Sequence, residues 1–382
     1  MKIRNWRSPI IWLVMLVFSG CVEPYFPEVK ESTSSLLVVN GFLNANGPTT
    51  IQLLRTQSLN ETGAPPAEED ATVIVESENG ERFGLHQTGN GNYVHPNMQL
   101  STDSKYRLYI RTRSGSEYAS DYVEVKPSPP IENVRWAADR GELKFYVNSQ
   151  DPNNNTHYYK WEFEETWQIR PALSSDIIFD NGSVRNRTQS DVPIAICWKS
   201  DNSSTIELGT TVKLSEDRIS DYKIQAIPYN AEKIGIKYSI LVKQYALTRE
   251  AFEYMEMLKK NTENIGTLFD PLPSQLTSNI RNLTNPDEPV IGYLTATSMQ
   301  TKRIFVNNRE LPHDWQLYYP TCHIDTVMIS SGAVNALFTG GNLIPVTSIY
   351  GSSPFPIGYT YGTRPCVDCT TRGTNVKPAF WE

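Results

Sequence analysis

Short apolar runs separated by turn-forming residues recur along most of the chain, and this pattern constrains the fold more than any other feature of the sequence. Asn79-Gly80 follows one run and Ser114-Gly115 follows another, as in β-hairpins. Within residues 105–111, Tyr106, Leu108 and Ile110 fall on one face of an extended strand because successive side chains alternate. The pattern therefore predicts a mostly β protein built from short strands.

The composition fits a folded protein of more than one domain. The chain has 382 residues, of which 39% are hydrophobic and 20% are charged, and this lies outside the range typical of disordered proteins. At about 150 residues per domain, this length predicts two or three domains. The formal net charge of -7 supplies no cationic field for a phosphate backbone, so we expect no nucleic-acid partner.

A proline run at residues 127–130 marks a domain boundary, because proline cannot donate a ladder hydrogen bond. We predict two tandem β-sandwich domains, an immunoglobulin-like sandwich over residues 36–126 and a fibronectin type III-like sandwich over residues 130–382. A polar stretch over residues 168–218 is expected to be a long insertion in the second sandwich. Residues 290–305 are expected to return as a strand, and the tail from Gly332 to form loops tied down by a disulfide.

One helix is predicted over residues 248–260. Thr248 is a suitable N-cap, and Ala251, Met255 and Leu258 recur at helical spacing. Basic residues in the last turn are favourable for the helix dipole. The segment therefore has the features of a single amphipathic helix in a β-rich chain.

The first residues carry the features of a bacterial lipoprotein. Residues 1–20 have a basic start and an apolar run at residues 10–18 that is too short to span a bilayer. Phe18-Ser19-Gly20 precedes Cys21 and resembles a lipobox, in which the cysteine receives a diacylglycerol. We expect lipidation of Cys21, a polar spacer over residues 21–35 and tethering to a lipid bilayer by the acyl chains. An ordinary secretory signal is the alternative.

Four further cysteines are expected to form two disulfides, because an even count in an exported chain favours oxidation. They are Cys197, Cys322, Cys366 and Cys369. Three pairings are open, and we favour Cys366 with Cys369 and Cys197 with Cys322, since neighbours in sequence meet at the least entropic cost. A zinc site that includes His323 is the competing interpretation, but there is only one C-x-x-C pair, and we expect no metal.

Several segments resemble a known family. They are residues 261–271 (NTENIGTLFDP), 288–293 (EPVIGY), 366–369 (CVDC) and 373–378 (GTNVKP), followed by Phe380-Trp381. Together they resemble domain of unknown function 4249, a family of Bacteroidetes outer-membrane lipoproteins often encoded beside TonB-dependent receptors. The resemblance implies an outer-membrane location, on the periplasmic or the cell-surface face, and an accessory role to a TonB-dependent transporter. Asp325-Thr326-Val327 also resembles the O-glycosylation tripeptide of Bacteroidetes.

One loop has part of a calcium-binding pattern. Asp151, Asn153, Asn155 and Glu162 stand at positions 1, 3, 5 and 12 of a calcium-loop spacing. The sixth position is Thr156 instead of the glycine that the sharp turn requires, so a loop stabilised by Asx turns is the favoured interpretation.

Glutamates in the following strand are expected to lie on a solvated face, with Glu162 and Glu164 on one side and Glu165 on the other. The five histidines are scattered, and no hydrolase, metalloprotease or phosphate-loop pattern occurs. We therefore expect no catalytic residues, no cofactor and no enzyme activity.

Aromatic residues crowd the C-terminal part of the chain. They are Tyr318, Tyr319, Tyr350, Phe355, Tyr359, Tyr361, Phe380 and Trp381. Exposed aromatic side chains are typical of interfaces, so we predict partner binding at Tyr350, Tyr359 and Tyr361 together with residues 168–218. Closure of the end of the second sandwich is the alternative role of these aromatics. The expected function is a non-catalytic accessory or ligand-binding lipoprotein in nutrient uptake; the alternatives are a structural or adhesive surface protein and, less favoured, a metal-dependent hydrolase.

Overall fold

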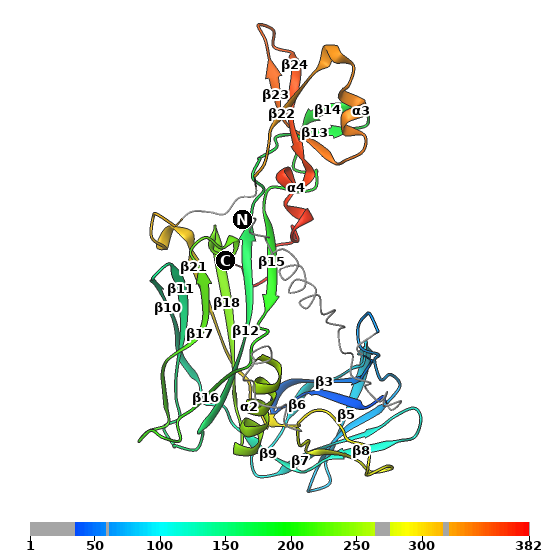
Figure 1. Cartoon of the computed structure of the whole chain (residues 1–382), viewed down its shortest axis with the longest axis vertical. Coiled ribbons are helices and arrows are strands. Elements are labelled where there is room, and N and C mark those ends of the chain that lie inside the picture. Colours follow the sequence, from blue (N-terminus) through cyan, green and yellow to red (C-terminus); the bar gives the residue numbers. More distant parts are fainter. Residues whose placement is uncertain (1–34, 59–60, 264–275, 316–320, 382) are drawn as a thin grey trace, which may run out of the picture.

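The computed structural model describes residues 35–58, 61–263, 276–315 and 321–381. The molecule is elongated and has three parts, shown in Figure 1. A first domain lies at one end, a second domain forms the middle, and a small distal unit lies at the other end. Cys21, the signal segment, nearly all of the spacer and Tyr318-Tyr319 lie outside the described residues.

The first domain is a single large sheet rolled around one core. Its strands are β1 (Leu37–Gly41), β2 (Leu43–Asn44), β3 (Asn46–Arg55), β4 (Thr72–Ser77), β5 (Arg82–Gly89), β6 (Asn92–Gln99), β7 (Lys105–Arg111), β8 (Glu117–Ser120), β9 (Val123–Lys126), β19 (Ile280–Asn282) and β20 (Ala296–Thr297). The strand order is β1-β3-β6-β5-β4-β7-β9-β20-β2, and β19 pairs with β8 beside β7. As the alternation predicts, Tyr106, Leu108 and Ile110 on β7 all face the core.

Residues after the helix return to the first domain, contrary to the prediction that residues 130–382 form one sandwich. β20 lies parallel between β2 and β9, and the Val39 amide donates to the Ile291 carbonyl at 2.8 Å. Val290, Leu294 and Ala296 complete the first core. The predicted strand over residues 290–305 is therefore divided between two domains, because an apolar pattern indicates burial without identifying which core provides it.

The second domain packs two sheets face to face. One consists of β10 (Ile131–Asp139), β11 (Glu142–Gln150) and β17 (Arg218–Pro228); the other consists of β12 (Tyr158–Ile169), β15 (Cys197–Asn202), β16 (Glu207–Thr210), β18 (Lys237–Ala246) and β21 (Gln300–Asn307). Short 3-10 turns, η1 (Glu232–Ile234) and η2 (Asn308–Glu310), follow β17 and β21. Phe145, Trp161 and Tyr238 are fully buried between the sheets.

The predicted helix is present as α2 (Arg249–Glu263). Thr248 Oγ1 accepts a hydrogen bond from the Ala251 amide at 3.2 Å, as expected of an N-cap. Ala251 and Phe252 face the second domain through Leu247 and Tyr158. Within the described residues, no helix is long and apolar enough to cross a membrane.

The distal unit is built from two segments far apart in sequence. Its elements are β13 (Ile177–Asp180), β14 (Ser183–Asn186), β22 (Asp325–Met328), β23 (Leu343–Tyr350), β24 (Pro356–Thr363), α3 (Val334–Phe338), α4 (Arg364–Val367) and the 3-10 turn η3 (Ile329–Ser331). β22-β24-β23 form one sheet and β13-β14 form a hairpin. The prediction of loops after Gly332 is therefore wrong: glycines and prolines punctuate a real sheet here, and Ile177, Phe338 and Tyr359 form its own small core.

Two disulfides are present, as predicted, but the favoured pairing is wrong. Cys197 is bonded to Cys369, and Cys322 is bonded to Cys366. Cys369 begins the 3-10 turn η4 (Cys369–Thr371) and packs in the core of the second domain, whereas Cys366 lies in α4 of the distal unit. Loop entropy favours neighbouring cysteines only in an unstructured chain; here the folded backbone directs the two side chains into different parts of the molecule.

Candidate functional site

The distal unit brings together the two segments that the sequence analysis predicts for partner binding. Strand β13 comes from the polar insertion and packs beside β23 from the C-terminal region. The Asp176 amide donates to the Val346 carbonyl at 3.2 Å, and Ser175 Oγ donates to the Pro345 carbonyl at 2.7 Å. The part of the insertion with β13 and β14 is therefore an ordered piece of a composite unit, whereas β15 and β16, which were predicted to belong to the same insertion, are strands of the second domain.

This unit is firmly joined to the second domain. The Leu173 amide donates to the Cys366 carbonyl at 2.9 Å, and the Cys369 amide donates to the Ile194 carbonyl at 3.0 Å. The backbones of Trp198 and Thr374 exchange two hydrogen bonds, at 2.7 and 2.9 Å. The Cys197–Cys369 disulfide lies on the second-domain side of this connection and the Cys322–Cys366 disulfide on the side of the distal unit, at the end of the molecule opposite the first domain (Figure 1).

The three tyrosines predicted for partner binding differ in exposure. Tyr350 is 57% exposed at the end of β23. Tyr359 is only 8% exposed and belongs to the core of the distal unit. Tyr361 is half-buried and packs edge-on against Phe338 with ring centroids 5.9 Å apart. Of the three, only Tyr350 is freely available on the surface.

The last aromatic residues close the end of the second domain, the role that the sequence analysis gives as the alternative. Trp381 is 6% exposed, and its ring lies 5.5 Å from that of Phe305 and 6.3 Å from that of Trp198. Phe380 is covered by the Arg303 guanidinium, 3.5 Å from the ring centre. The expected exposure is therefore wrong for Trp381.

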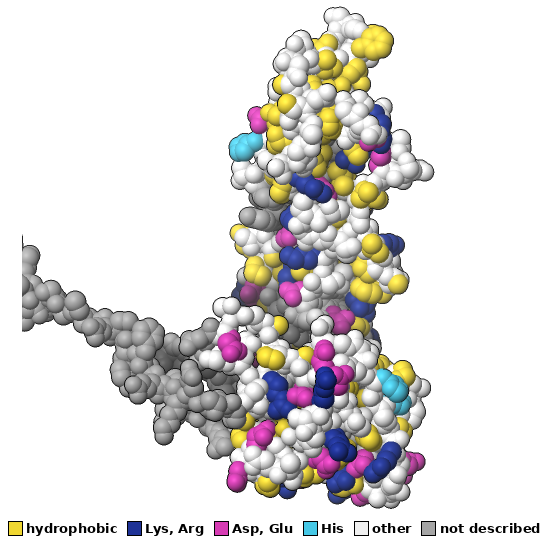
Figure 2. Space-filling view, turned by 90° about the vertical axis from the view of Figure 1, so that its right-hand side faces the viewer, with side chains coloured by type: hydrophobic (Ala, Val, Ile, Leu, Met, Phe, Trp, Pro, Cys, Tyr) yellow, Lys and Arg dark blue, Asp and Glu magenta, His cyan; other side chains and the backbone are white. Residues whose placement is uncertain are grey.

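Large apolar side chains are nevertheless exposed on the distal unit. Those near the turn between β23 and β24 we call the apolar tip; its members are Met328, Ile329, Tyr350, Phe355 and Ile357. Phe355, in the turn between β23 and β24, is 75% exposed. Figure 2 shows hydrophobic and uncharged polar side chains at this end, whereas charged side chains are frequent at the other end.

The segment that carries the apolar tip has almost no charge. Residues 326–363 contain no Asp, Glu, Lys, Arg or His, in a chain that is 20% charged. The prediction of partner binding in this region rested on its aromatic residues alone, although the uncharged stretch is also visible in the sequence. A surface of aromatic, Met and Ile side chains without charge has the composition of the buried centre of a protein interface.

Charges of the insertion are paired with one another beneath the tip. Arg185 binds Asp180 at 2.9 Å and Asp191 at 2.7 Å. The Arg185 hydrogen bonds and the Thr188 amide lower the pKa of Asp191 well below its usual range. The same two carboxylates raise the pKa of Arg185. These groups neutralise one another and stabilise the insertion.

The suspected calcium loop uses its oxygens internally. Asp151 Oδ1 accepts from the Asn153 amide at 3.0 Å, and Oδ2 accepts from the Asn155 amide at 3.1 Å. Burial would raise the pKa of Asp151, but these amides outweigh it and the pKa is lowered. Glu162 points elsewhere, to Lys160 at 2.7 Å and the Tyr245 hydroxyl at 2.9 Å. This is the Asx-turn loop that the sequence favours.

Glu165 is a buried carboxylate, not a member of a solvated strand face. It accepts hydrogen bonds from the Tyr238 hydroxyl at 2.6 Å and from Lys233, and Gln225 lies at 3.3 Å. Lys233 also lies over the Trp167 ring, 4.9 Å from its centre. Burial, followed by the charge of Glu165, raises the pKa of Tyr238 well above its usual value. Every oxygen has a partner, so this network is part of the core packing.

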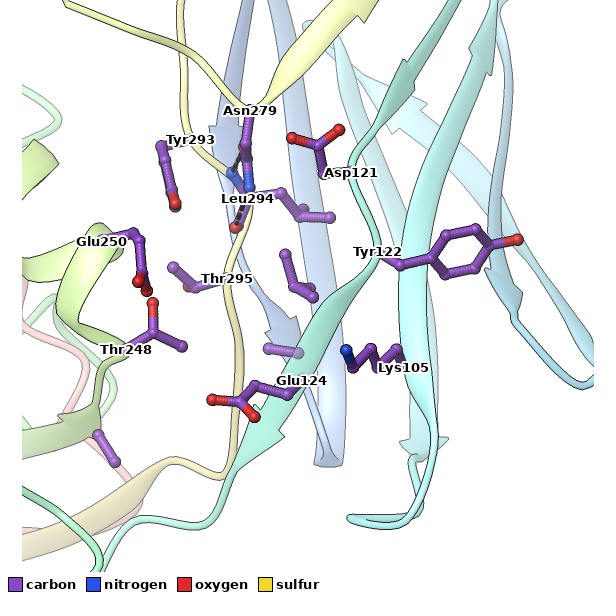
Figure 3. Close-up of a pocket in the computed structure, with 13 residues that line it drawn as sticks. Lys105, Asp121, Tyr122, Glu124, Thr248, Glu250, Asn279, Tyr293, Leu294 and Thr295 are labelled. Atoms are coloured by element: carbon purple, nitrogen blue, oxygen red, sulfur yellow. Dashed lines mark hydrogen bonds between the residues drawn. The ribbon is translucent and has the colours of Figure 1, made fainter.

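A small crevice of about 190 Å³ lies where the first domain meets the start of α2 (Figure 3). Asp121, Glu124 and Glu250 line it, but they come from different sides and do not converge. Asn279 bridges to the Leu294 backbone at 2.9 and 2.8 Å, and Tyr122 points away toward Arg107. Within the residues that the structure describes, no three His, Cys, Asp or Glu side chains are grouped as metal ligands.

The disulfides are incompatible with zinc binding by these cysteines. All four sulfur atoms are bonded in pairs, and zinc requires thiolates. The Cys322, Cys366 and Cys369 cluster is therefore structural, and His323 lies exposed beside it.

Solved structures offer little guidance. The chain is similar to the chicken interferon gamma receptor alpha chain at 13% identity, covering 56% of this chain and 90% of that one, with a TM-score of 0.12. It is similar to a chitinase, ChiA74 from Bacillus thuringiensis, at 12% identity and a TM-score of 0.15, covering 52% of this chain and 29% of the chitinase.

Sequence comparison is more informative about the family. No curated protein matches the chain. A family model described as domain of unknown function DUF4249 matches residues 22–303, which is most of the chain and includes the first domain and most of the second. The chain therefore belongs to the DUF4249 family.

Proposed function

We propose that this protein is a non-catalytic, lipid-anchored outer-membrane protein that binds a TonB-dependent transporter through the apolar tip. One observation carries the proposal: exposed apolar side chains of residues 328–357, a stretch without charged residues, gather at the end of an elongated molecule. Burying such a surface against a partner removes apolar area from water without desolvating any charge.

The rigidity of the distal unit supports this role. Tyr350 and Phe355 flank the turn between the paired strands β23 and β24, so less conformational entropy is lost when the tip binds than when an unpaired loop binds. Phe355 and Tyr350 supply large, stiff aromatic side chains. Aromatic residues are enriched in protein interfaces, and tyrosine is among the residues that most often dominate the binding energy.

The direction of the chain supports the same arrangement. The described chain begins at Ser35 in the first domain, at the end opposite the tip. With an anchor at Cys21, the first domain would be the part nearest the lipid attachment, and the tip would be free to reach a neighbouring protein. The anchor and the membrane location remain part of the proposal.

The test is co-purification from native outer membrane. Tyr350→Ser with Phe355→Ser removes the two most exposed members of the tip and should reduce recovery of the transporter by at least about tenfold. Val212→Ser with Leu214→Ser is the matched control, because these residues are also more than half exposed but lie beyond β16, away from the tip. Equal loss in both variants would contradict the assigned surface, and absence of any barrel from the wild-type preparation would contradict the transporter role in favour of an adhesive one.

A further inference from the structure

One edge strand of the distal sheet is covered by another segment of the chain, and the other edge strand is not paired with a further strand in the described residues. β23 is covered by the insertion, since residues Ser175 and Asp176 hydrogen-bond to the Pro345 and Val346 carbonyls. β22 is the opposite edge of the same sheet. Of its four residues only Val327 is buried, and Asp325, Thr326 and Met328 are exposed.

β22 also has few of the features that keep edge strands from pairing. Proteins protect such edges by keeping the strand very short, or with lysine, proline, bulges or inward-pointing charges. β22 is short, but it has no lysine, proline or bulge. The segment from Ile324 to Ile329 has a single charge, Asp325, at the start of the strand, and the pairing of β22 with β24 is regular. Ile324 and Ile329, on either side of the strand, are 53% and 42% exposed. An open, apolar edge of this kind is a template for another strand.

We propose that β22 pairs antiparallel with β22 of a second copy of this chain, which would join the two distal sheets into one continuous sheet. A two-fold axis perpendicular to the sheet places one residue of the strand opposite itself. With Thr326 at this centre, Ile324 lies opposite Met328 and Asp325 lies opposite Val327. Ile324 and Met328 then meet on one face and the threonines pair, while on the other face each Asp325 lies opposite Val327 and the two carboxylates do not face each other.

The absence of Lys and Arg beside β22 favours a second copy of the chain over a membrane surface as its partner. Binding to anionic lipid headgroups uses Lys and Arg beside the apolar residues, and residues 326–363 contain neither. The second copy, in contrast, supplies a strand without Lys or Arg, in which Ile324, Thr326 and Met328 match the same positions of β22 across the two-fold axis. The strand is short, so the association is weak in dilute solution and is favoured where the copies are confined at high local concentration.

Thr326→Cys in the full-length protein tests the pairing directly. Opposed residues of an antiparallel pair have Cα atoms about 4.5 to 5.5 Å apart, within the range of a disulfide. Mild oxidation of intact cells should convert most of the variant into a covalent dimer that reductant separates. Thr347→Cys is the matched control, because Thr347 is exposed on the same face of the sheet through Thr360 but belongs to the covered strand β23; it should stay monomeric.

A second variant checks the same pairing without a new cysteine. Thr326→Lys places two like charges opposite each other on the two-fold axis and should abolish the dimer in native mass spectrometry of concentrated protein, while capture of the transporter by the Tyr350 and Phe355 surface stays unchanged. Peptide mapping of the Thr326→Cys protein should show the Cys322 to Cys366 disulfide intact. The proposal is overturned if the Thr326→Cys protein forms no more covalent dimer than the Thr347→Cys protein, if it links to a different protein, or if the intact mass of the wild type shows a glycan on Thr326.

Discussion

Cys197 and Cys369 are 172 residues apart in sequence, yet their Cα atoms lie 5.7 Å apart across a disulfide. Cys197 opens the strand β15, where the chain returns from the distal insertion, and Cys369 opens the final turn after α4. The bond therefore joins the two points at which the chain leaves the distal unit and re-enters the second domain. This geometry holds the apolar tip in a fixed position relative to the second domain.

The two disulfides should stabilise different parts of the molecule. Cys197→Ser with Cys369→Ser should lower the free energy of unfolding of the second domain by about 2 to 5 kcal/mol, because Cys197 and Cys369 both belong to its core. Cys322→Ser with Cys366→Ser should instead loosen the distal unit, and the melting of the second domain should change much less. Calorimetry combined with hydrogen exchange separates the two effects; identical exchange patterns in the two variants would contradict this division.

Acid should loosen the insertion through Asp191. The pKa of Asp191 is lowered in the folded protein by Arg185 and Thr188, so the unfolded chain binds its proton more readily. The stabilisation is therefore complete above the unfolded pKa of about 3.9 and is lost as the pH falls further toward the folded pKa. Hydrogen exchange of residues 177–186, corrected for intrinsic rates, should accelerate below about pH 4 in the wild type.

Two variants test whether the Asp191 carboxylate causes this acid response. Asp191→Asn should show fast exchange in residues 177–186 at every pH, with a flatter acid response. Asp287→Asn, at an exposed position of the first domain, should behave like the wild type. If Asp191→Asn keeps the wild-type acid response, the ion pair with Arg185 does not control this segment.

Alanine variants at two glycines of one turn distinguish the cost of a steric clash from the cost of a strained backbone. Gly91 has φ +71 and a Cβ there would lie 2.2 Å from the Leu53 carbonyl oxygen; Gly89 has φ +102 with nothing within 4 Å. Both alanine variants strain the backbone, by about 1 to 3 kcal/mol, but Gly91→Ala must also push β3 away and lose the Leu53 to Gly91 hydrogen bond. Chemical denaturation should show Gly91→Ala as clearly less stable than Gly89→Ala; equal stabilities would show that the contact is relieved without loss.

Lipidation at Cys21 is a prediction from sequence. Cys21→Ala should abolish metabolic labelling with palmitate and leave the protein unprocessed or released from the membrane fraction. Ser19→Thr, which keeps a small polar residue before the cysteine, serves as the matched control and should still be labelled. Labelling that persists in Cys21→Ala would favour an ordinary secretory signal.

Local features of this fold could be predicted from sequence, whereas long-range pairings could not. Alternation placed Tyr106, Leu108 and Ile110 in a core, and the cap at Thr248 marked the start of α2, because both depend on neighbours in the chain. The return of β20 to the first domain and the bond between Cys197 and Cys369 depend on residues more than a hundred positions apart, for which a single sequence carries no register.

For the candidate site, too, some features could be predicted from the sequence and others could not. Partner binding at Tyr350 and residues 168–218 stays a prediction; of that segment, the structure places β13 beside β23, whereas β15 and β16 belong to the second domain. Tyr359 was expected on the surface because aromatic residues are common in interfaces, yet its position on β24 faces Val327 and the small core. The pattern around Tyr359 gave no period from which the buried face could be read. The uncharged stretch over residues 326–363 was a readable signal.

The central claim is that the apolar tip contacts the transporter, and site-specific photo-crosslinking in intact cells tests it most directly. A photoreactive amino acid at Phe355 should form an adduct with an outer-membrane barrel protein that mass spectrometry identifies as a TonB-dependent transporter. The same group at Val212, which is also exposed but lies away from the tip, should form none. Adducts with the barrel from position 212 and not from position 355, or adducts of position 355 with lipid alone, would contradict the account.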